Sequence, residues 1–415
     1  MKSILKTFIT VTIVAHLVSA QGTGSPVEVL FKNNKDILAA EKAYQSALEA
    51  IGISGVLPDP MIEGTLFLAP IETRNGPMEG QVMLGQKFPL WGKLNRERQV
   101  AKLKADITGY NLQQKRIKAA FKMRKAWTMY VRLTNSLRIL NEYRSELKSF
   151  QSIALTQYAT GVGGTQHPIL KLQIEMSLIE TQINNLESDY ESTVNELQAL
   201  FDGYFSPDLF GDEWKIRPAK GSTGDLLELA MSTHPWYKIS MTEKQVAVLQ
   251  NELAVRKNYP DLVAGVTYTA IGPETEMVSA DAGRDAFGFK IGLNLPLWFK
   301  RNKARIASTK MMVKSKEEMV EEIWNQVVDE VLSANKELYE IEETYTLYET
   351  KLLQESEQML SSAFAAYETG KISFLDLLDS ERMVVRVRLD FEKIKANKNI
   401  TTARLLRAIG LVHPM

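Results

Sequence analysis

Two acidic residues, Asp376 and Asp379, stand close together near the C-terminal end of the 415-residue chain, in the stretch GKISFLDLLDSER. A spacing of three residues puts both carboxylates on one face of a helix. Clustered carboxylates attract cations electrostatically, and more strongly where solvent screens them poorly. The same spacing equally suits ordinary acidic residues in the first turn of a helix, where the helix dipole favours negative charge. The turn by itself leaves both interpretations open.

The other residues that could carry chemistry form no recognisable constellation. The chain has no cysteine, which excludes disulfides, thiolate metal sites and a lipid-anchored cysteine. Its four histidines do not make a ligand motif: His16, His167, His234 and His413. Met311 and Met312 lie in a helical pattern and indicate packing. We therefore predict that the protein is not an enzyme and has no metal or cofactor.

The N-terminus is typical of a secretory signal peptide. Lys2 and Lys6 precede an apolar run, and Ala20 suits cleavage before Gln21. The run is shorter than the ~20 residues that a membrane-spanning helix needs, and no later segment is long enough. Formal net charge is zero, so no overall basic field points to nucleic acid. We predict a secreted chain from which residues 1–20 are removed.

Two very long helical patterns cover about 93–160 and 300–369, and the two aspartates stand just after the end of the second one. Neither contains proline, and at ~1.5 Å per residue each would be on the order of 100 Å long. Apolar residues return at three- and four-residue steps, which predicts antiparallel or supercoiled helix packing. Each pattern ends at a Tyr-x-Thr-Gly turn, whose glycines are Gly161 and Gly370.

Four runs of alternating polarity precede the long helices in pairs. In AFGFKIGLNLPLW, Phe287, Phe289 and Ile291 share a face opposite small and polar residues. The first pair is less regular, because Pro70 interrupts its first run. One such run would fit a half-buried strand of a soluble sheet. Four runs of about ten residues on a secreted chain favour a membrane β-barrel.

Both pairs end in the same junction, FPLWGKLNR at 88–96 and LPLWFKRNK at 295–303. Proline ends a strand because it has no N–H for the ladder, and tryptophan suits the membrane–water interface. The lysines and arginines that follow can reach water or headgroups. A soluble strand-to-helix connection would explain one copy, but less readily two. The residues that we place at the membrane interface are Pro89, Trp91, Pro296 and Trp298.

The order of helix, hairpin, long helix and returning helix occurs twice, which indicates an internal duplication. We predict a mainly α protein with a membrane β-barrel and a two-fold internal repeat. Its expected parts are a signal peptide at 1–20, a first repeat at 21–200 (hairpin about 61–90, long helix about 93–160, returning helix about 168–200), an insert at 201–223, and a second repeat at 224–415 (helix about 224–257, hairpin about 262–298, long helix about 300–369, returning helix about 374–409).

Two expectations concern how these parts assemble. From their lengths, the helices at 168–200 and 224–257 should stack end to end, and the helix at 374–409 should pair likewise with the segment near 33–50. Four strands cannot close a barrel, and an open sheet edge is not satisfied in lipid. The chain should therefore oligomerise, and three chains would supply twelve strands.

The junctions QKFPLWGKLNRER and LNLPLWFKRNKAR, the turn YETGKISFLDLLDSER and the duplicated order of elements resemble the TolC-type outer-membrane efflux channel family over nearly the whole mature chain. The resemblance implies a trimer with a 12-stranded barrel in the cell outer membrane and an antiparallel coiled-coil tunnel in the periplasm. It implies passive conduction to the exterior in a tripartite efflux or type I secretion system, with an inner-membrane pump and a periplasmic adaptor supplying drive and selectivity. The stretch YATGVGGTQHPILKLQIEMSLIE looks most like the branch that serves heavy-metal-type pumps of the resistance-nodulation-division class.

The resemblance also implies roles for the turn residues. Family members carry aspartates that form a constricting ring at the periplasmic entrance, and Asp376 and Asp379 match those positions. Lys371 stands beside Ile372, where the best-known relative carries an arginine, so the salt-bridge lock of that relative is absent or rearranged. The helix-turn tips at Gly161 and Gly370 would contact the adaptor.

A different class of protein shares the long helices, namely a periplasmic adaptor or a secreted coiled-coil scaffold. Such a protein would lack paired hairpins that end in PLW, and its long helical hairpin would occur once. An outer-membrane trimer should sediment with membranes and need detergent for release, whereas a scaffold should be released by salt.

Overall fold

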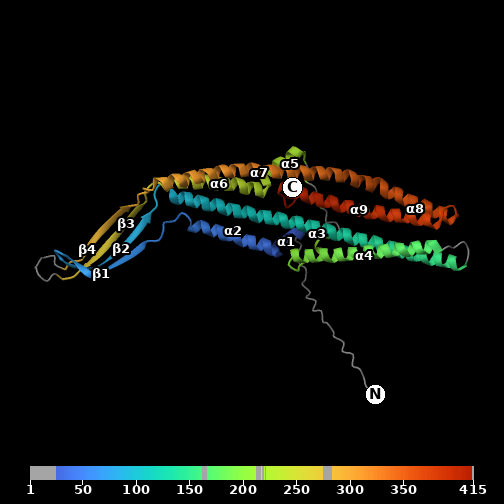
Figure 1. Ribbon diagram of the computed structural model, residues 1–415, viewed down its shortest axis with the longest axis horizontal. Coiled ribbons are helices and arrows are strands. Elements are labelled where there is room, and N and C mark those ends of the chain that lie inside the picture. The colour runs from blue at the N-terminus through green and yellow to red at the C-terminus, as the bar shows by residue number, and fades with distance from the viewer. Residues whose placement is uncertain are drawn as a thin grey trace, which may run out of the picture.

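The computed structural model is an elongated molecule with a β-sheet at one end and a long rod of helices behind it (Figure 1). The expected signal peptide, most of the second hairpin loop and Gly161 lie outside the residues that the structure describes. The described residues are 25–160, 166–211, 216, 219, 221–273 and 283–413.

The elements of the chain follow one another in two similar series. The first comprises α1 (Pro26–Asn33), α2 (Lys35–Ile53), β1 (Met61–Thr73), β2 (Gly76–Phe88), α3 (Lys93–Thr160) and α4 (Gln166–Leu200), followed by a short 3₁₀ turn (Pro207–Leu209). The second comprises α5 (Thr223–Thr233), α6 (Pro235–Arg256), β3 (Leu262–Ile271), β4 (Ala286–Leu293), α7 (Phe299–Leu347), a π-helical turn η2 (Tyr348–Leu352), α8 (Leu353–Glu368) and α9 (Phe374–Ile409).

The four strands form one antiparallel sheet in the order β1-β2-β3-β4, so β1 and β4 are its free edges. Strand β1 continues through Pro70, and the irregularity expected there is a register shift against β2 between Leu66 and Ile71. A proline can sit in this strand because β1 is an edge strand and needs ladder donors on one side only.

An apolar row crosses all four strands on one face of the sheet. The register aligns Ile62, Leu84, Val266 and Phe289 across β1 to β4. These side chains are 74%, 46%, 47% and 90% exposed, respectively. Large apolar side chains that nothing covers mark a surface for lipid or for another protein.

The long helical patterns are helices in the structure, with one irregularity. Helix α3 is continuous over 68 residues, because its sequence contains no proline to interrupt the helix. The pattern expected at 300–369 contains the π-helical turn η2 between α7 and α8. A π turn adds a residue to one helical repeat and so shifts the face that the following helix presents. None of the described helices is both long and apolar enough to cross a membrane.

The end-to-end stacking of the shorter helices differs from the expectation. Helix α4 stacks on α2, where Asn34 donates a hydrogen bond to the carbonyl of Leu200 at 2.9 Å and Lys35 pairs with Asp202 at 2.9 Å. Helix α9 meets the α5–α6 junction, where the Thr233 hydroxyl donates to the carbonyl of Ile409 at 2.6 Å. Figure 1 shows α2 and α4 in line on one side of α3, and α6 and α9 in line on the other.

Helix lengths alone could not distinguish these pairings, because α2 and α6 have similar lengths (19 and 22 residues) and so do α4 and α9 (35 and 36 residues). The contacts at the joints decide them. The single helix expected at 224–257 is likewise two helices. The chain breaks at His234, because Pro235 has no N–H to continue the ladder and starts a new helix instead.

The insert after α4 joins the helical core through aromatic side chains. Phe201, Phe205 and Phe210 are buried with Trp127 of α3. The rings of Trp127 and Phe210 stack at a centroid separation of 3.9 Å. This cluster fixes the middle of the rod, where α2 meets α4.

Candidate functional sites at the two ends of the molecule

The start of α9 is held by a capping box that uses one of the two aspartates. The Ser373 side chain accepts a hydrogen bond from the backbone N–H of Asp376, and the Asp376 carboxylate accepts from the Ser373 N–H at 3.0 Å and hydroxyl at 2.7 Å. These hydrogen bonds stabilise the ionised carboxylate and lower the pKa of Asp376. Asp376 therefore stabilises the first turn of α9.

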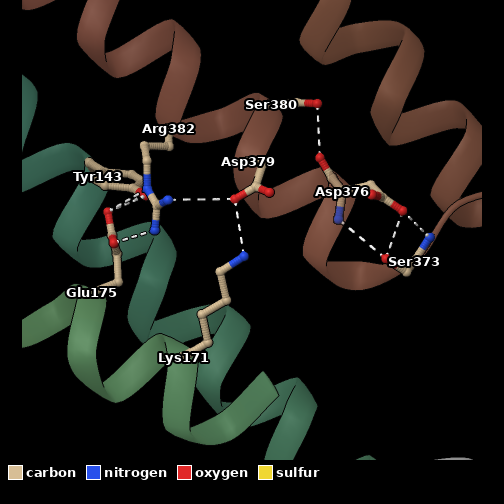
Figure 2. A network of polar contacts seen from close by, with 8 residues as sticks. All are labelled: Tyr143, Lys171, Glu175, Ser373, Asp376, Asp379, Ser380 and Arg382. Carbon is tan, nitrogen blue, oxygen red and sulfur yellow. Dashed lines mark hydrogen bonds and ion pairs between the residues drawn. The ribbon is translucent and has the colours of Figure 1, made fainter. Parts of the chain in front are cut away.

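Asp379 has different partners, Lys171 on another helix and Arg382 on α9 itself (Figure 2). Its Oδ1 atom is 3.2 Å from Nζ of Lys171 on α4 and 3.5 Å from a guanidinium nitrogen of Arg382. Figure 2 shows Asp379 turned toward these two cations, while Asp376 is turned toward Ser373. The two carboxylates share a helix start but take part in separate contacts.

Arg382 continues this network into the interior. It makes two hydrogen bonds to Glu175 of α4, from Nη2 to Oε2 at 2.5 Å and from Nε to Oε1 at 3.1 Å. The Tyr143 hydroxyl of α3 donates to Oε1 of Glu175 at 3.3 Å. Burial, followed by the nearby Glu175 charge, raises the pKa of Tyr143, which therefore stays protonated as a donor. The network joins the consecutive helices α3 and α4 to α9, which lies about 170 residues or more further along the chain.

Beside the network, α9 buries a second carboxyl group. Glu381 is 9% exposed and lies within hydrogen-bonding reach of Glu146 on α3. Burial, and then the hydrogen bond and negative charge of Glu146, raise the pKa of Glu381 to about 7. Arg388 opposes this shift, but it also pairs with Glu357 of α8 at 3.1 Å. The α3–α9 seam thus contains a group that titrates near neutral pH.

The remaining expected entrance residues lie at the turn before α9. Gly370 has a φ of +69°, which an L side chain rarely adopts, and ends the helix as expected for a C-terminal glycine. Lys371 is exposed and makes no ion pair within the described part of the chain. Gly161, the corresponding tip of the first helical hairpin, lies outside the described residues.

Sequence reasoning missed Lys171, Glu175, Arg382 and Glu381. A signal was present in the charges of the two helices. Lys171 and Glu175 stand four residues apart on one face of α4, and Asp379 and Arg382 stand three residues apart on one face of α9. The acidic and basic residues come in the opposite order on the two helices. Using that signal requires knowing that α4 and α9 lie close enough for these side chains to meet.

At the opposite end, the first sheet–helix junction is tightly bonded within the chain. The Trp91 indole donates to the carbonyl of Pro260 at 3.0 Å. The ammonium of Lys93 binds Asp261 at 2.6 Å and the carbonyl of Tyr259 at 2.7 Å. Lys93 and Asp261 are 5% and 6% exposed. Burial opposes ionisation of Asp261, but hydrogen bonds from Lys93 and Lys87 outweigh it and lower its pKa.

The second junction has the same sequence pattern but few of these contacts. Trp298 is 70% exposed, and its indole makes no hydrogen bond to any residue that the structure describes. Lys300 is exposed and likewise has no ion pair within the described chain. The carbonyl of Pro296, in the same junction, accepts a hydrogen bond from the Asn302 side chain at 3.1 Å. Pro89 occupies the corresponding place between β2 and α3 in the first junction.

Together these features define a class of protein, a long helical rod that carries a four-stranded antiparallel sheet with an uncovered apolar face. Residues 27–202 match the family model of the outer membrane efflux protein family. The fold is similar to that of the CmeC outer membrane channel of Campylobacter jejuni (15% identity, TM-score 0.75, covering 94% of this chain and 85% of that one). It is also similar to VceC of Vibrio cholerae (16% identity, TM-score 0.73, covering 92% of this chain and 95% of that one). A third similar structure is the open state of the MtrE outer membrane channel of Neisseria gonorrhoeae (13% identity, TM-score 0.75, covering 94% of this chain and 88% of that one).

No curated protein matches the sequence significantly. The family match and the shared fold confirm the resemblance to the TolC-type outer-membrane efflux family that the sequence predicted. The structure of this chain confirms the prediction of a mainly helical protein, and it contains a four-stranded antiparallel sheet. The roles of the entrance aspartates, the turn tips and the junction tryptophans stay predictions.

Proposed function

We propose that three copies of this chain form an outer-membrane channel that passively conducts substrates from the periplasm to the exterior. The observation that carries the proposal is the sheet, which has two edges and an exposed apolar row that no described residue pairs with or covers. In lipid each edge must find a partner, because unpaired backbone groups cost several kcal/mol each. Three copies joined β4 to β1 would make a closed barrel of twelve strands.

The helical rod extends this barrel into a periplasmic tunnel in the proposal. The helices of one chain lie side by side in columns (Figure 1). The columns are α2 stacked on α4, the single helix α3, α6 stacked on α9, and α7 continued by α8. Three such curved layers would close into a tube. The end formed by the start of α9 is the proposed entrance, with Asp376, Asp379 and Lys371 near its opening.

The polar network at that end would restrain the entrance. Lys171 and Glu175 belong to the first helical hairpin, whereas Asp379 and Arg382 belong to the second. Widening the tube requires the hairpins to separate, and these ion pairs oppose the separation. We propose that a periplasmic adaptor contacts the turn tips at Gly161 and Gly370, and that an inner-membrane pump, of the resistance-nodulation-division class on the sequence resemblance, supplies drive and selectivity.

The alternative, a periplasmic adaptor or secreted scaffold, accounts for the helices but not for the apolar sheet. Mass measurement in detergent and planar-bilayer recording separate the two. The channel predicts a detergent-stable trimer, heat-modifiable on gels, that gives steady single-channel currents. A salt-extractable monomer without conductance would refute the channel.

A further inference from the structure

The two sheet–helix junctions of this chain repeat the same residues in different surroundings. Trp91 and Lys93 follow β2, and Trp298 and Lys300 follow β4 with the same spacing. Strand β2 has β3 beside it, and Asp261 at the entry to β3 binds Lys93. Strand β4 is an edge, so no strand of the same chain lies beside its exit. Lys300 consequently lacks the kind of partner that Lys93 has.

A matching acidic residue stands at the other edge of the sheet. Pro58 and Asp59 stand before β1, separated from it by Pro60, and Pro260 and Asp261 directly precede β3. Asp59 is exposed and forms no ion pair with any described residue. Within the residues that the structure describes, each chain thus has a lysine without an ion-pair partner at one edge and an aspartate without one at the other, both at the helical end of the sheet.

The side-chain alternation gives the two aspartates the same orientation. Ile62 and Val266 lie in the same apolar row across the sheet. Asp59 is three residues before Ile62, and Asp261 is five residues before Val266. Odd separations along a strand direction place a residue on the opposite face. Extended back beyond Met61 and Leu262, the first residues of β1 and β3, the alternation would place both aspartates on the face opposite the apolar row.

We propose that Lys300 of each chain binds Asp59 of the next chain, reproducing between copies the ion pair that Lys93 and Asp261 make within one chain. This inference rests on the proposed trimer and names the charged contact that seals its barrel-to-tunnel seam. Closing β4 against β1 of a second copy would bring the exit of β4 beside the entry of β1, as β2 and β3 are arranged within the chain. This ion pair would then favour one register, because a shift of the strands would separate the two charges.

The proposal covers the ion pair and not the tryptophan contact. Trp91 and Gly92 have φ values of +65° and +70°, and this backbone aims the indole at Pro260. Phe299 takes the place of Gly92 in the second junction, and Trp298 has a φ of −81°. A phenylalanine rarely adopts the left-handed conformation, so the second tryptophan is presented differently.

Crosslinking tests the contact directly, since the chain has no native cysteine. The double variant Lys300→Cys/Asp59→Cys is treated with a short bismaleimide in outer-membrane fractions and analysed on denaturing gels. We expect bands of two and three chains. The matched pair Lys93→Cys/Asp261→Cys should crosslink within one chain and still migrate as a single chain, and Lys300→Cys alone should give no ladder.

Charge reversal tests whether the contact stabilises the assembly. Lys300→Glu and Asp59→Lys should each lower the temperature at which the trimer dissociates, by several degrees, and the double reversal should restore most of the loss. Lys314→Glu is the control, because Lys314 is an exposed cation of α7 without an ion pair in the described chain.

The outcomes separate this inference from the proposed function. A parent protein that is not a trimer would refute the proposed function and this inference together. An intact trimer whose Lys300→Cys/Asp59→Cys variant gives no interchain band, or whose double reversal restores nothing, would refute the Lys300–Asp59 pair alone.

Discussion

Arg382 of α9 and Glu175 of α4 are joined by two hydrogen bonds, and the Glu175 side chain is only 8% exposed. The carboxylate therefore depends on Arg382 and Tyr143 to replace its water. Arg382→Ala leaves a buried charge without its cation, and we expect a loss of about 1–3 kcal/mol. The dissociation temperature of the detergent-solubilised protein should fall accordingly.

The matched variants test the cause of that loss. Glu175→Ala/Arg382→Ala should be less destabilised than Arg382→Ala, because no buried charge is left unpaired. Arg382→Lys should lie between the parent and Arg382→Ala, since lysine keeps the charge but not the two-point geometry. Equal losses in the single and double alanine variants would mean that packing, not the ion pair, matters here.

Glu381 predicts a pH dependence near neutrality. Its pKa is raised from an ordinary 4.5 to about 7 by burial and by Glu146, so ionisation opposes the folded seam. The stability that the protonated group contributes is fully present below about pH 4.5 and is lost as pH rises to about 7. Thermal dissociation followed from pH 4.5 to 8 should show this decline.

The neutral variant Glu381→Gln should flatten the curve and stabilise the protein at pH 8, by about 1–3 kcal/mol. Glu146→Gln should shift the decline to lower pH, because it removes the facing negative charge. A Glu381→Gln variant with an unchanged pH profile would assign the decline to another group.

Asp376 and Asp379 predict cation-selective conductance with block by divalent or trivalent cations added at the helical end. We expect Asp376→Asn/Asp379→Asn to abolish the block, because the double variant removes both charges at the proposed entrance. Asparagine at position 376 keeps one side-chain oxygen that can accept from Ser373, so the start of α9 and the assembly should be preserved. Planar-bilayer recordings that show parental block in this variant would reject the entrance ring.

The apolar row predicts lipid contact at Phe289. We expect Phe289→Cys to resist a membrane-impermeant maleimide in outer-membrane fractions, since its side chain would face hydrocarbon. Lys290→Cys is the matched control, because the next residue along a strand points to the opposite face, which lines the proposed lumen. Strong aqueous labelling at position 289 would contradict the membrane assignment of the sheet.

Local features of the sequence account for much of the architecture. Helix α3 is long because its apolar residues return every three or four positions and no proline interrupts it. The strands follow from alternation over eight to thirteen residues. Strand β2 ends directly before Pro89, which has no N–H to donate, whereas β1 runs through Pro70. Each signal depends on neighbours within a few residues, so it can be read from the chain directly.

The sequence by itself also determined the resemblance to outer-membrane efflux channels and the identity of the two aspartates near the α9 start. Only the tertiary structure decided that α4 stacks on α2, that Asp379 meets Lys171, and that Glu381 is buried against Glu146. It also decided that Lys93 has an ion-pair partner and that Lys300 has none among the described residues. These contacts join segments far apart in the chain, and they depend on how each helix is rotated and which strand lies at an edge, which no local pattern of residues specifies.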